Sequence, residues 1–115
     1  MNNTVVFALS SSVGLADEIC THLQIERSPI LINRFSDGEI LIEPEVSVRG
    51  KHVFIVQSTS KPVSSNYMEV LIALDAMKRA SCAEVSVVMP YFGYARQDRK
   101  ARARQPITAK LMANL

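Results

Sequence analysis

Short runs of β-branched and apolar residues alternate along this chain with segments of helical periodicity, and this alternation constrains the fold most. The apolar runs predict strands over residues 4–9, 30–33, 52–57 and 84–89. Between the first two runs, a helix is predicted from apolar residues at helical spacing: Leu15, Ala16, Ile19, Cys20 and Leu23. Strands that alternate with helices at this spacing predict a three-layer α/β domain with a mainly parallel sheet.

A second helix is predicted over residues 67–79, introduced by Asn66 with Glu69 three residues later, which has the form of an N-terminal cap. Its apolar residues lie on more than one side: Met68, Leu71, Ile72 and Ala76 on one, and Val70, Leu74 and Met77 on another. A helix that is apolar nearly all round is buried on both sides. Because 115 residues supply one modest domain, the second side is expected to meet a partner subunit or a further domain.

A hairpin is predicted in the middle of the chain. Asp37-Gly38 between extended segments is a strong turn signal, because glycine accepts a positive φ without a steric penalty. The apolar residues that alternate with polar ones after this turn are Ile40, Ile42, Val46 and Val48. This alternation predicts hairpin strands with one solvated face, protruding from the sheet.

Residues 90–106 concentrate positive charge directly after the strand predicted over residues 84–89. They include five of the 13 Lys and Arg residues but one acid, Asp98. The five are Arg96, Arg99, Lys100, Arg102 and Arg104. This segment therefore carries +4, whereas the other eight basic and ten acidic residues give −2. Loops that leave the carboxyl ends of strands line the ligand crevice of open α/β sheets, so a ligand is expected here.

The basic segment suits a multiply charged anion that carries a flat ring, and both a nucleotide and single-stranded RNA fit that description. Arginine grips phosphate oxygens in pairs, and Gln97 can hydrogen-bond a base edge or a phosphate. Neither a Walker loop nor a Rossmann glycine fingerprint occurs. Bound phosphates would therefore be held by side-chain cations. The alternative interpretation is a solvated basic loop without a ligand.

A second candidate cluster is formed by Phe35, Asp37 and Glu39. The ring could stack on a base while the carboxylates accept hydrogen bonds from base or ribose; a plain hairpin turn with solvated acids is the alternative. Ser47 and Arg49, near another turn, could hold an anion, although such residues also occur on ordinary surfaces.

The remaining sequence features concern the cellular compartment, membrane association and metal binding. No apolar stretch approaches membrane-spanning length, and the N-terminus does not have the pattern of a signal peptide. Cys20 and Cys82 fall on predicted apolar faces and are interpreted as reduced core thiols. His22 and His52 have no Cys or His at metal-ligand spacing. We therefore expect a cytoplasmic protein that does not bind a membrane and has no metal site within this chain.

Six motifs of this chain resemble those of the ribose-phosphate pyrophosphokinase family in their residues, order and spacing. They are Arg-Phe-Ser-Asp-Gly-Glu at 34–39, Ser-Val-Arg-Gly at 47–50, Gln-Ser-Thr at 57–59, Met-Lys-Arg-Ala-Ser at 77–81, Pro-Tyr-Phe-Gly-Tyr-Ala-Arg-Gln-Asp-Arg at 90–99 and Pro-Ile-Thr-Ala-Lys at 106–110. The resemblance covers essentially residues 1–115 and implies the N-terminal domain of a longer enzyme, built from two similar α/β domains of the type I phosphoribosyltransferase fold.

By this resemblance, the enzyme transfers diphosphate from Mg-ATP to ribose 5-phosphate, giving phosphoribosyl pyrophosphate and AMP for nucleotide biosynthesis. The resemblance implies an oligomer. Its metal-binding histidine, catalytic loop and ribose-phosphate loop correspond to positions beyond Leu115. We therefore assign no catalytic or metal-binding residue to this chain and place the residues that bind Mg²⁺ beyond Leu115. The ribose 5-phosphate site is expected mostly in the following domain, and the chain by itself is expected to be inactive.

The resemblance also implies two binding sites that include residues of this chain. The ATP-binding residues would be Phe35, Asp37, Gly38, Glu39, Arg96, Gln97 and Arg99. The first four belong to a hairpin that, in the family, reaches into the ATP site of a neighbouring subunit. Ser47, Arg49 and Ser81 would belong to a regulatory anion site, where phosphate activates and ADP inhibits.

Two other functions compete with this interpretation. One is a non-catalytic regulatory or associated subunit, which binds nucleotide or co-assembles with active subunits. The other is a nucleic-acid-binding domain that uses the basic segment. Steeply salt-dependent RNA binding would favour a nucleic-acid function, whereas selective binding of ATP over a random oligonucleotide would favour the kinase. The family resemblance leads us to expect no nucleic-acid partner.

Overall fold

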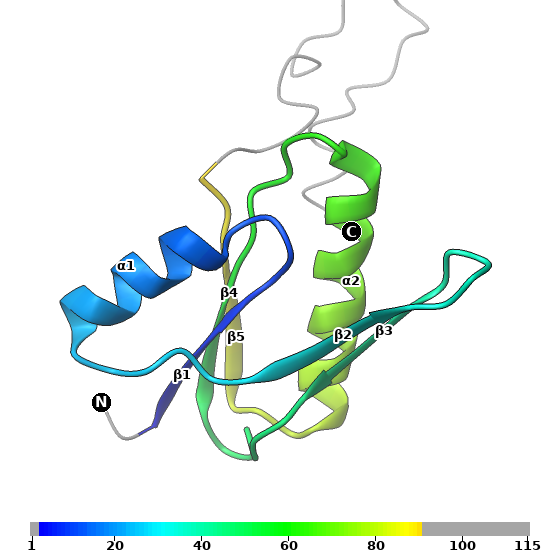
Figure 1. Cartoon of the computed structure of the whole chain (residues 1–115). Helices are drawn as coiled ribbons and strands as arrows, with labels where there is room; N and C mark the ends of the chain where they lie inside the picture. Colours follow the sequence, from blue (N-terminus) through cyan, green and yellow to red (C-terminus); the bar gives the residue numbers. More distant parts are fainter. Residues whose placement is uncertain (1–2, 91–115) are drawn as a thin grey trace, which may run out of the picture.

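The structure is a computed structural model that describes residues 3–90. Its centre is a parallel sheet of β1 (Thr4–Ala8), β4 (His52–Val56) and β5 (Glu84–Val88), with β4 in the middle (Figure 1). Val53 of β4 pairs with Val5 on one side and Val85 on the other. These strands form where the sequence predicts them, because each is a run of β-branched and apolar residues.

Each face of this sheet is covered by one helix, α1 (Val13–Leu23) or α2 (Val63–Arg79), as Figure 1 shows. Alternate residues of β1 point to opposite faces: Val6 and Ala8 pack with α1, whereas Phe7 packs with α2. Because side chains along a strand alternate, a strand buried on both faces needs a continuous apolar run. The predicted three-layer α/β domain with a mainly parallel sheet is confirmed.

The chain between α1 and β4 forms a separate antiparallel hairpin of β2 (Ile30–Arg34) and β3 (Ile40–Pro44). Its register pairs Arg34 with Ile40, at the end next to the loop. β3 lies against α2, and Ile42 is buried in the same core as the sheet residues that face α2. The loop at the end of the hairpin extends away from the rest of the domain, as predicted (Figure 1).

Two predicted boundaries are wrong. The alternation through Val46 and Val48 does not extend the hairpin strand, because β3 ends at Pro44 and Val46 is exposed. Helix α2 begins at Val63 with Pro62 in the N-cap position, so it starts before the predicted residue 67. Asn66 and Glu69 consequently do not cap the helix. Both are buried and bind polar groups of the loops at the carboxyl ends of the strands.

The second apolar side of α2 is covered in part within the chain. Val70 and Met77, which share one predicted apolar side, pack on the sheet together with Ala73. The hairpin lies over part of the remaining surface and leaves an open groove of about 440 Å³ between β3 and α2. The lining residues are Ile40, Leu41, Ile42, Glu43, Pro44, Ile72, Asp75, Ala76, Arg79 and Ala80. The hairpin therefore supplies part of the cover, whereas Met68 of α2 is 48% exposed, so the expected partner subunit or further domain stays a prediction.

Both cysteines are free thiols, as predicted, but their settings differ. Cys20 is a buried residue of α1, whereas Cys82 is only half-buried. Burial raises the pKa of the Cys20 thiol; Asp17 raises it further and Arg27 opposes the change. Because the thiolate is the reactive form, a raised pKa makes Cys20 a poor nucleophile. Among residues 3–90, neither helix has the length and apolarity needed to cross a bilayer.

Candidate functional site

The hairpin loop carries the predicted aromatic and acidic cluster. The Phe35 amide donates to the Glu39 carbonyl at 2.8 Å, and the Gly38 amide donates to the Phe35 carbonyl at 2.9 Å. Gly38 has φ +93°, a conformation that favours glycine, so the predicted Asp-Gly turn is confirmed. The Asp37 carboxylate accepts the Glu39 amide at 3.0 Å. The loop is therefore closed by its own hydrogen bonds.

The same loop presents its functional groups to solvent. Phe35 is 49% exposed, and Asp37 and Glu39 are also exposed. An aromatic ring held open beside two carboxylates can stack on a flat ring while the acids accept hydrogen bonds. The loop can therefore form one side of a site for a ligand with a flat ring.

An ion pair lies at the base of this loop. Arg34, the last residue of β2, donates through Nη2 to Glu69 Oε2 at 2.5 Å and to Ser65 Oγ at 2.8 Å. Glu69 lies on α2 and its side chain is fully buried. Its other oxygen, Oε1, accepts the Ser10 amide at 3.1 Å and the Gln57 side-chain amide at 3.2 Å. The buried carboxylate thus joins the hairpin, α2 and the sheet.

Further polar contacts gather where β1 and β4 end. The Gln57 side-chain oxygen accepts the Ser11 amide at 3.1 Å and the Ser11 hydroxyl at 2.7 Å. Ser12 Oγ accepts the Ser58 amide at 2.8 Å. Residues 10–12 and 57–59 therefore form one connected polar layer at the carboxyl edge, the edge at which open α/β sheets bind ligands.

The predicted cationic loop begins at this same edge. The backbone amide of Gln57 donates to the Val88 carbonyl at 3.0 Å. The end of β5, and Pro90 after it, therefore lie beside the polar layer. Arg96, Gln97 and Arg99 lie outside the described residues.

The three residues predicted for an anion site come from two loops at the opposite edge of the sheet. The Gly50 amide donates to the Ser81 carbonyl at 3.0 Å, so the turn after Ser47 and Arg49 contacts the turn that follows α2. All three predicted side chains are exposed. Ser81 has φ +62°, an uncommon conformation for a residue with a side chain. The structure therefore brings this predicted set into one neighbourhood.

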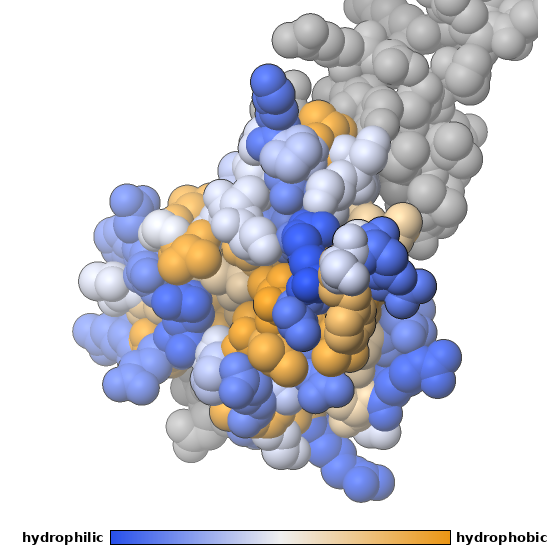
Figure 2. Space-filling view, turned by 45° about the vertical axis from the view of Figure 1, so that its right-hand side comes forward, coloured by the Kyte–Doolittle hydropathy of each residue, from blue (hydrophilic) through white to orange (hydrophobic). Residues whose placement is uncertain are grey.

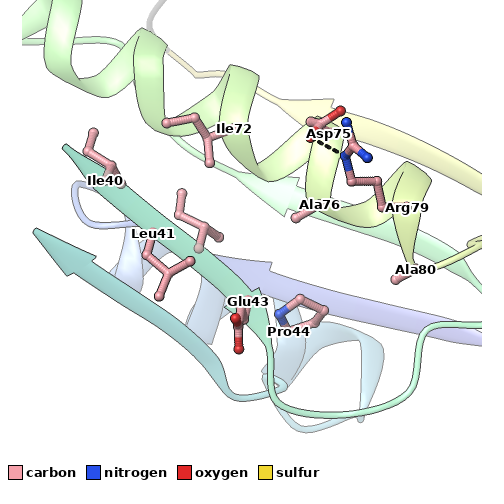
Figure 3. Close-up of a pocket in the computed structure, with 10 residues that line it drawn as sticks. Ile40, Leu41, Glu43, Pro44, Ile72, Asp75, Ala76, Arg79 and Ala80 are labelled. Carbon is pink, nitrogen blue, oxygen red and sulfur yellow. Dashed lines mark hydrogen bonds and ion pairs between the residues drawn. The ribbon is translucent and has the colours of Figure 1, made fainter.

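The groove between β3 and α2 differs in chemistry from both of these regions. Figure 2 shows apolar residues gathered on the side of the molecule where hairpin and helix meet, with hydrophilic residues around them. In Figure 3 the Asp75–Arg79 ion pair, 2.8 Å long, lies beside the aliphatic lining. Such a lining offers few partners for phosphate groups. Across residues 3–90, no cluster of three His, Cys, Asp or Glu residues could hold a metal ion.

Sequence reasoning missed the buried network around Glu69. The sequence predicts Glu69 as a capping partner of Asn66 and Gln57 as the last residue of a strand. An acid inside an otherwise apolar helix is a weak signal for such a network, because acids are almost never fully buried without a partner. Arg34, Ser10 and Gln57 are far from Glu69 in the sequence, so no local spacing identifies them as its partners.

Known proteins are similar to this chain in sequence and fold. A family model described as the N-terminal domain of ribose phosphate pyrophosphokinase matches residues 4–115. The chain is 55% identical over 114 residues to the ribose-phosphate pyrophosphokinase of Ureaplasma parvum, which covers 99% of this chain and 34% of that protein. It is 59% identical over 110 residues to ribose-phosphate pyrophosphokinase 1 of Streptococcus pneumoniae, covering 96% of this chain and 34% of that protein. The chain thus spans about a third of the length of these curated relatives.

The fold agrees with solved structures. Phosphoribosylpyrophosphate synthetase from Mycobacterium smegmatis has a TM-score of 0.93 and 38% identity, over 97% of this chain and 38% of that chain. Purine phosphoribosyltransferase from Pyrococcus horikoshii has a TM-score of 0.53 and 16% identity, over 76% of this chain and 58% of that chain. The second likeness shows the fold alone. The predicted resemblance to the type I phosphoribosyltransferase fold is confirmed.

Proposed function

The chain belongs to the family of the N-terminal domain of ribose-phosphate pyrophosphokinase, and from this premise we propose that residues 1–115 are the N-terminal domain of an enzyme that makes phosphoribosyl pyrophosphate. That enzyme transfers diphosphate from Mg-ATP to the C1 hydroxyl of ribose 5-phosphate and releases AMP. The observation that carries the proposal is the family match over residues 4–115, together with relatives of that name at 55% and 59% identity. Transfer to a sugar hydroxyl mainly requires positioning and charge neutralisation.

The hairpin loop is proposed to hold the adenine end of ATP. Phe35 would stack on the base, and Asp37 and Glu39 would accept hydrogen bonds from its amino group or from the ribose. The exposure of all three residues supports this assignment, as does the tight turn that Gly38 permits. Because the loop extends away from its own domain, we propose that it contributes to a nucleotide site on a neighbouring subunit of a homo-oligomer.

The basic loop is proposed to hold the polyphosphate through Arg96, Gln97 and Arg99. Its support is the local charge of the sequence and the delivery of Pro90 to the carboxyl edge of the sheet. As the family resemblance implies, the Mg²⁺ ion is proposed to arrive with ATP. Bound there, it would neutralise phosphate charge and orient the group that is transferred.

Ser47, Arg49 and Ser81 are proposed to form part of a regulatory site for phosphate and ADP. Their convergence through the Gly50–Ser81 hydrogen bond supports the assignment. An exposed arginine with nearby hydroxyl groups is suited to an anion. A cytoplasmic location belongs to the same proposal and is supported by the two free cysteines, since thiols persist in a reducing compartment.

Calorimetric titration with ATP tests the proposed nucleotide site. Arg96→Ala removes a charge-assisted contact worth about 1.5–3 kcal/mol, which predicts at least about a tenfold loss of affinity. Arg104→Ala is the matched control, because Arg104 lies in the same basic segment but outside the proposed pair. Equal weakening by both changes would identify a diffuse electrostatic patch and contradict the assignment.

An activity assay tests the expectation that the 115-residue chain is inactive by itself. The chain spans about a third of its curated relatives, and the predicted catalytic and ribose-phosphate groups are not within it. We therefore expect the 115-residue chain, incubated with Mg-ATP and ribose 5-phosphate, to release no AMP above background. Clear turnover by the purified chain would overturn that expectation.

A further inference from the structure

Glu69 is a fully buried acid whose role is not explained by the core around it. Its side chain is 0% exposed, and a carboxylate in such a place is costly unless it is paired and hydrogen-bonded. Here hydrogen bonds to both carboxylate oxygens offset this cost. The Ser10 amide and the Gln57 side-chain amide donate to Oε1, and these two groups belong to the loops at the carboxyl ends of β1 and β4.

The second carboxylate oxygen faces the hairpin. Arg34 donates to Oε2 from the end of β2, one residue before Phe35. The same Arg34 nitrogen also reaches Ser65 Oγ at 2.8 Å. One Glu69 carboxylate therefore binds the loops of the parallel sheet through Oε1 and the hairpin through Oε2.

The hairpin needs such a contact, because it is not hydrogen-bonded into the parallel sheet. Among the described residues it is joined to the domain by apolar packing of β3 on α2, as well as by the Arg34–Glu69 ion pair. Apolar packing is non-directional. A charge-assisted hydrogen bond has a defined direction and length, so it can set the angle at which the loop leaves the domain.

We propose that Glu69 is a positioning residue: through Arg34 it fixes the direction of the hairpin loop that carries Phe35, Asp37 and Glu39. The consequence for nucleotide binding rests on the function proposed above for that loop. Stability alone is a weak reason for such a pair, since well-packed apolar residues are often as stabilising as a buried ion pair. An apolar pair could stabilise the fold equally well, but it would not fix the direction of the loop as the Arg34–Glu69 pair does.

A tryptophan introduced into the loop reports its motion directly. The chain has no tryptophan, so Phe35→Trp gives a single fluorophore in the loop. This reporter is combined with Arg34→Gln and Glu69→Gln together, which removes both charges and leaves no unpaired buried charge. The matched control combines it with Asp75→Asn and Arg79→Gln, which removes an exposed ion pair of the same helix.

We expect the neutralised Arg34–Glu69 pair to lower the residual anisotropy of the tryptophan, and the control to leave it unchanged. Hydrogen exchange of residues 30–44 should accelerate by about tenfold, as expected for loss of a charge-assisted hydrogen bond. Exchange of β4 should stay unchanged. Unaltered anisotropy, or equal acceleration in β4 and the hairpin, would overturn the proposal. The variant Arg34→Lys, which keeps the charge, should restore much of the anisotropy.

A nucleotide titration separates this proposal from the function on which it rests. With Phe35 in place, neutralising Arg34 and Glu69 should weaken ATP binding at least about fivefold, because a mobile loop must be ordered on binding. If the wild-type chain binds ATP and the variant binds it equally well, Glu69 does not position the loop for nucleotide. If the wild-type chain binds no ATP, the proposed function of the loop fails, and the anisotropy result still decides the role of Glu69.

Discussion

Replacing Gln57 by glutamate should make the stability of the fold depend on pH. Gln57 is fully buried, and its side-chain nitrogen lies 3.2 Å from Glu69 Oε1. Its oxygen accepts two hydrogen bonds from Ser11. Gln57→Glu preserves size and the contacts to Ser11, but it turns a donor that faces Glu69 into a second carboxylate oxygen.

The size of the effect follows from this geometry. Two unit charges at 3.2 Å repel by about 5 kcal/mol at an effective dielectric constant of about 20. The pair can avoid this repulsion by keeping one proton. Keeping at pH 7 a proton that the unfolded chain releases near pH 4.3 costs about 1.36 kcal/mol for each of about 2.7 pH units. The cost is about 3.7 kcal/mol, less than the repulsion, so the protonated pair is the preferred state.

The sign follows from proton binding. The introduced carboxyl has its pKa raised in the folded state, so the folded chain binds more protons than the unfolded chain. The penalty is therefore absent below the unfolded pKa, grows as the pH rises, and becomes constant above the folded pKa. Stability should be lost toward neutral pH and regained in mild acid.

Urea denaturation at pH 5 and pH 7 measures this effect, with Gln57→Met as a neutral control of similar size. The difference in unfolding free energy between the two variants should grow by about 3 kcal/mol from pH 5 to pH 7. A difference that stays constant with pH would refute the reasoning. It would mean that the Gln57 amide nitrogen does not face Glu69.

Three further outcomes are expected. Light scattering should find a dimer or larger oligomer, because the hairpin loop leaves Phe35 uncovered; a clean monomer at high concentration would argue against this. Met77→Ala should lower the unfolding free energy in urea by about 2–5 kcal/mol, since Met77 is fully buried against the sheet; a loss below about 1 kcal/mol would place it outside the core. Ser81→Gly should raise stability by about 0.5–1 kcal/mol by relieving the positive φ and should weaken phosphate binding; lower stability would show that the Ser81 side chain stabilises the turn.

The sequence predicts the layers of this fold well, because they depend on periodicity that a single segment displays. The strand predicted over residues 52–57 is observed as β4, and the alternation of β1 between two helices follows from its unbroken apolar run. The Asp37-Gly38 turn is likewise a local property, since it depends on one residue that accepts a positive φ.

The start of α2 and the network at its centre could not be predicted in this way. Residues 63–65 show no apolar periodicity, so the first turn of α2 gives no signal in the sequence. Glu69 has the spacing of a capping residue, yet its partners come from three other segments. The local spacing favours a capping role for Glu69, but its tertiary contacts determine the position that it takes in the fold.

The proximity of Arg49 and Ser81 has a similar explanation. It was predicted from a family resemblance, because nothing in the spacing of two exposed turns indicates that they meet. The structure joins them through one backbone hydrogen bond between Gly50 and Ser81. Such contacts between loops depend on the strand order, which the sequence pattern leaves open.

The parallel pairing of β1 with β4 determines the order in which this chain can fold. β1 has no strand partner in the described sheet until β4 appears, after α1 and the whole hairpin. The entropy of closing that long loop is lost before the pairing gains any contacts, which slows folding. At a synthesis rate of about 5–20 residues per second, the two strands leave the ribosome roughly 2–10 s apart. During that interval residues 5–9, which are all buried in the finished core, remain without a strand partner. They are the segment on which we expect a chaperone to act first.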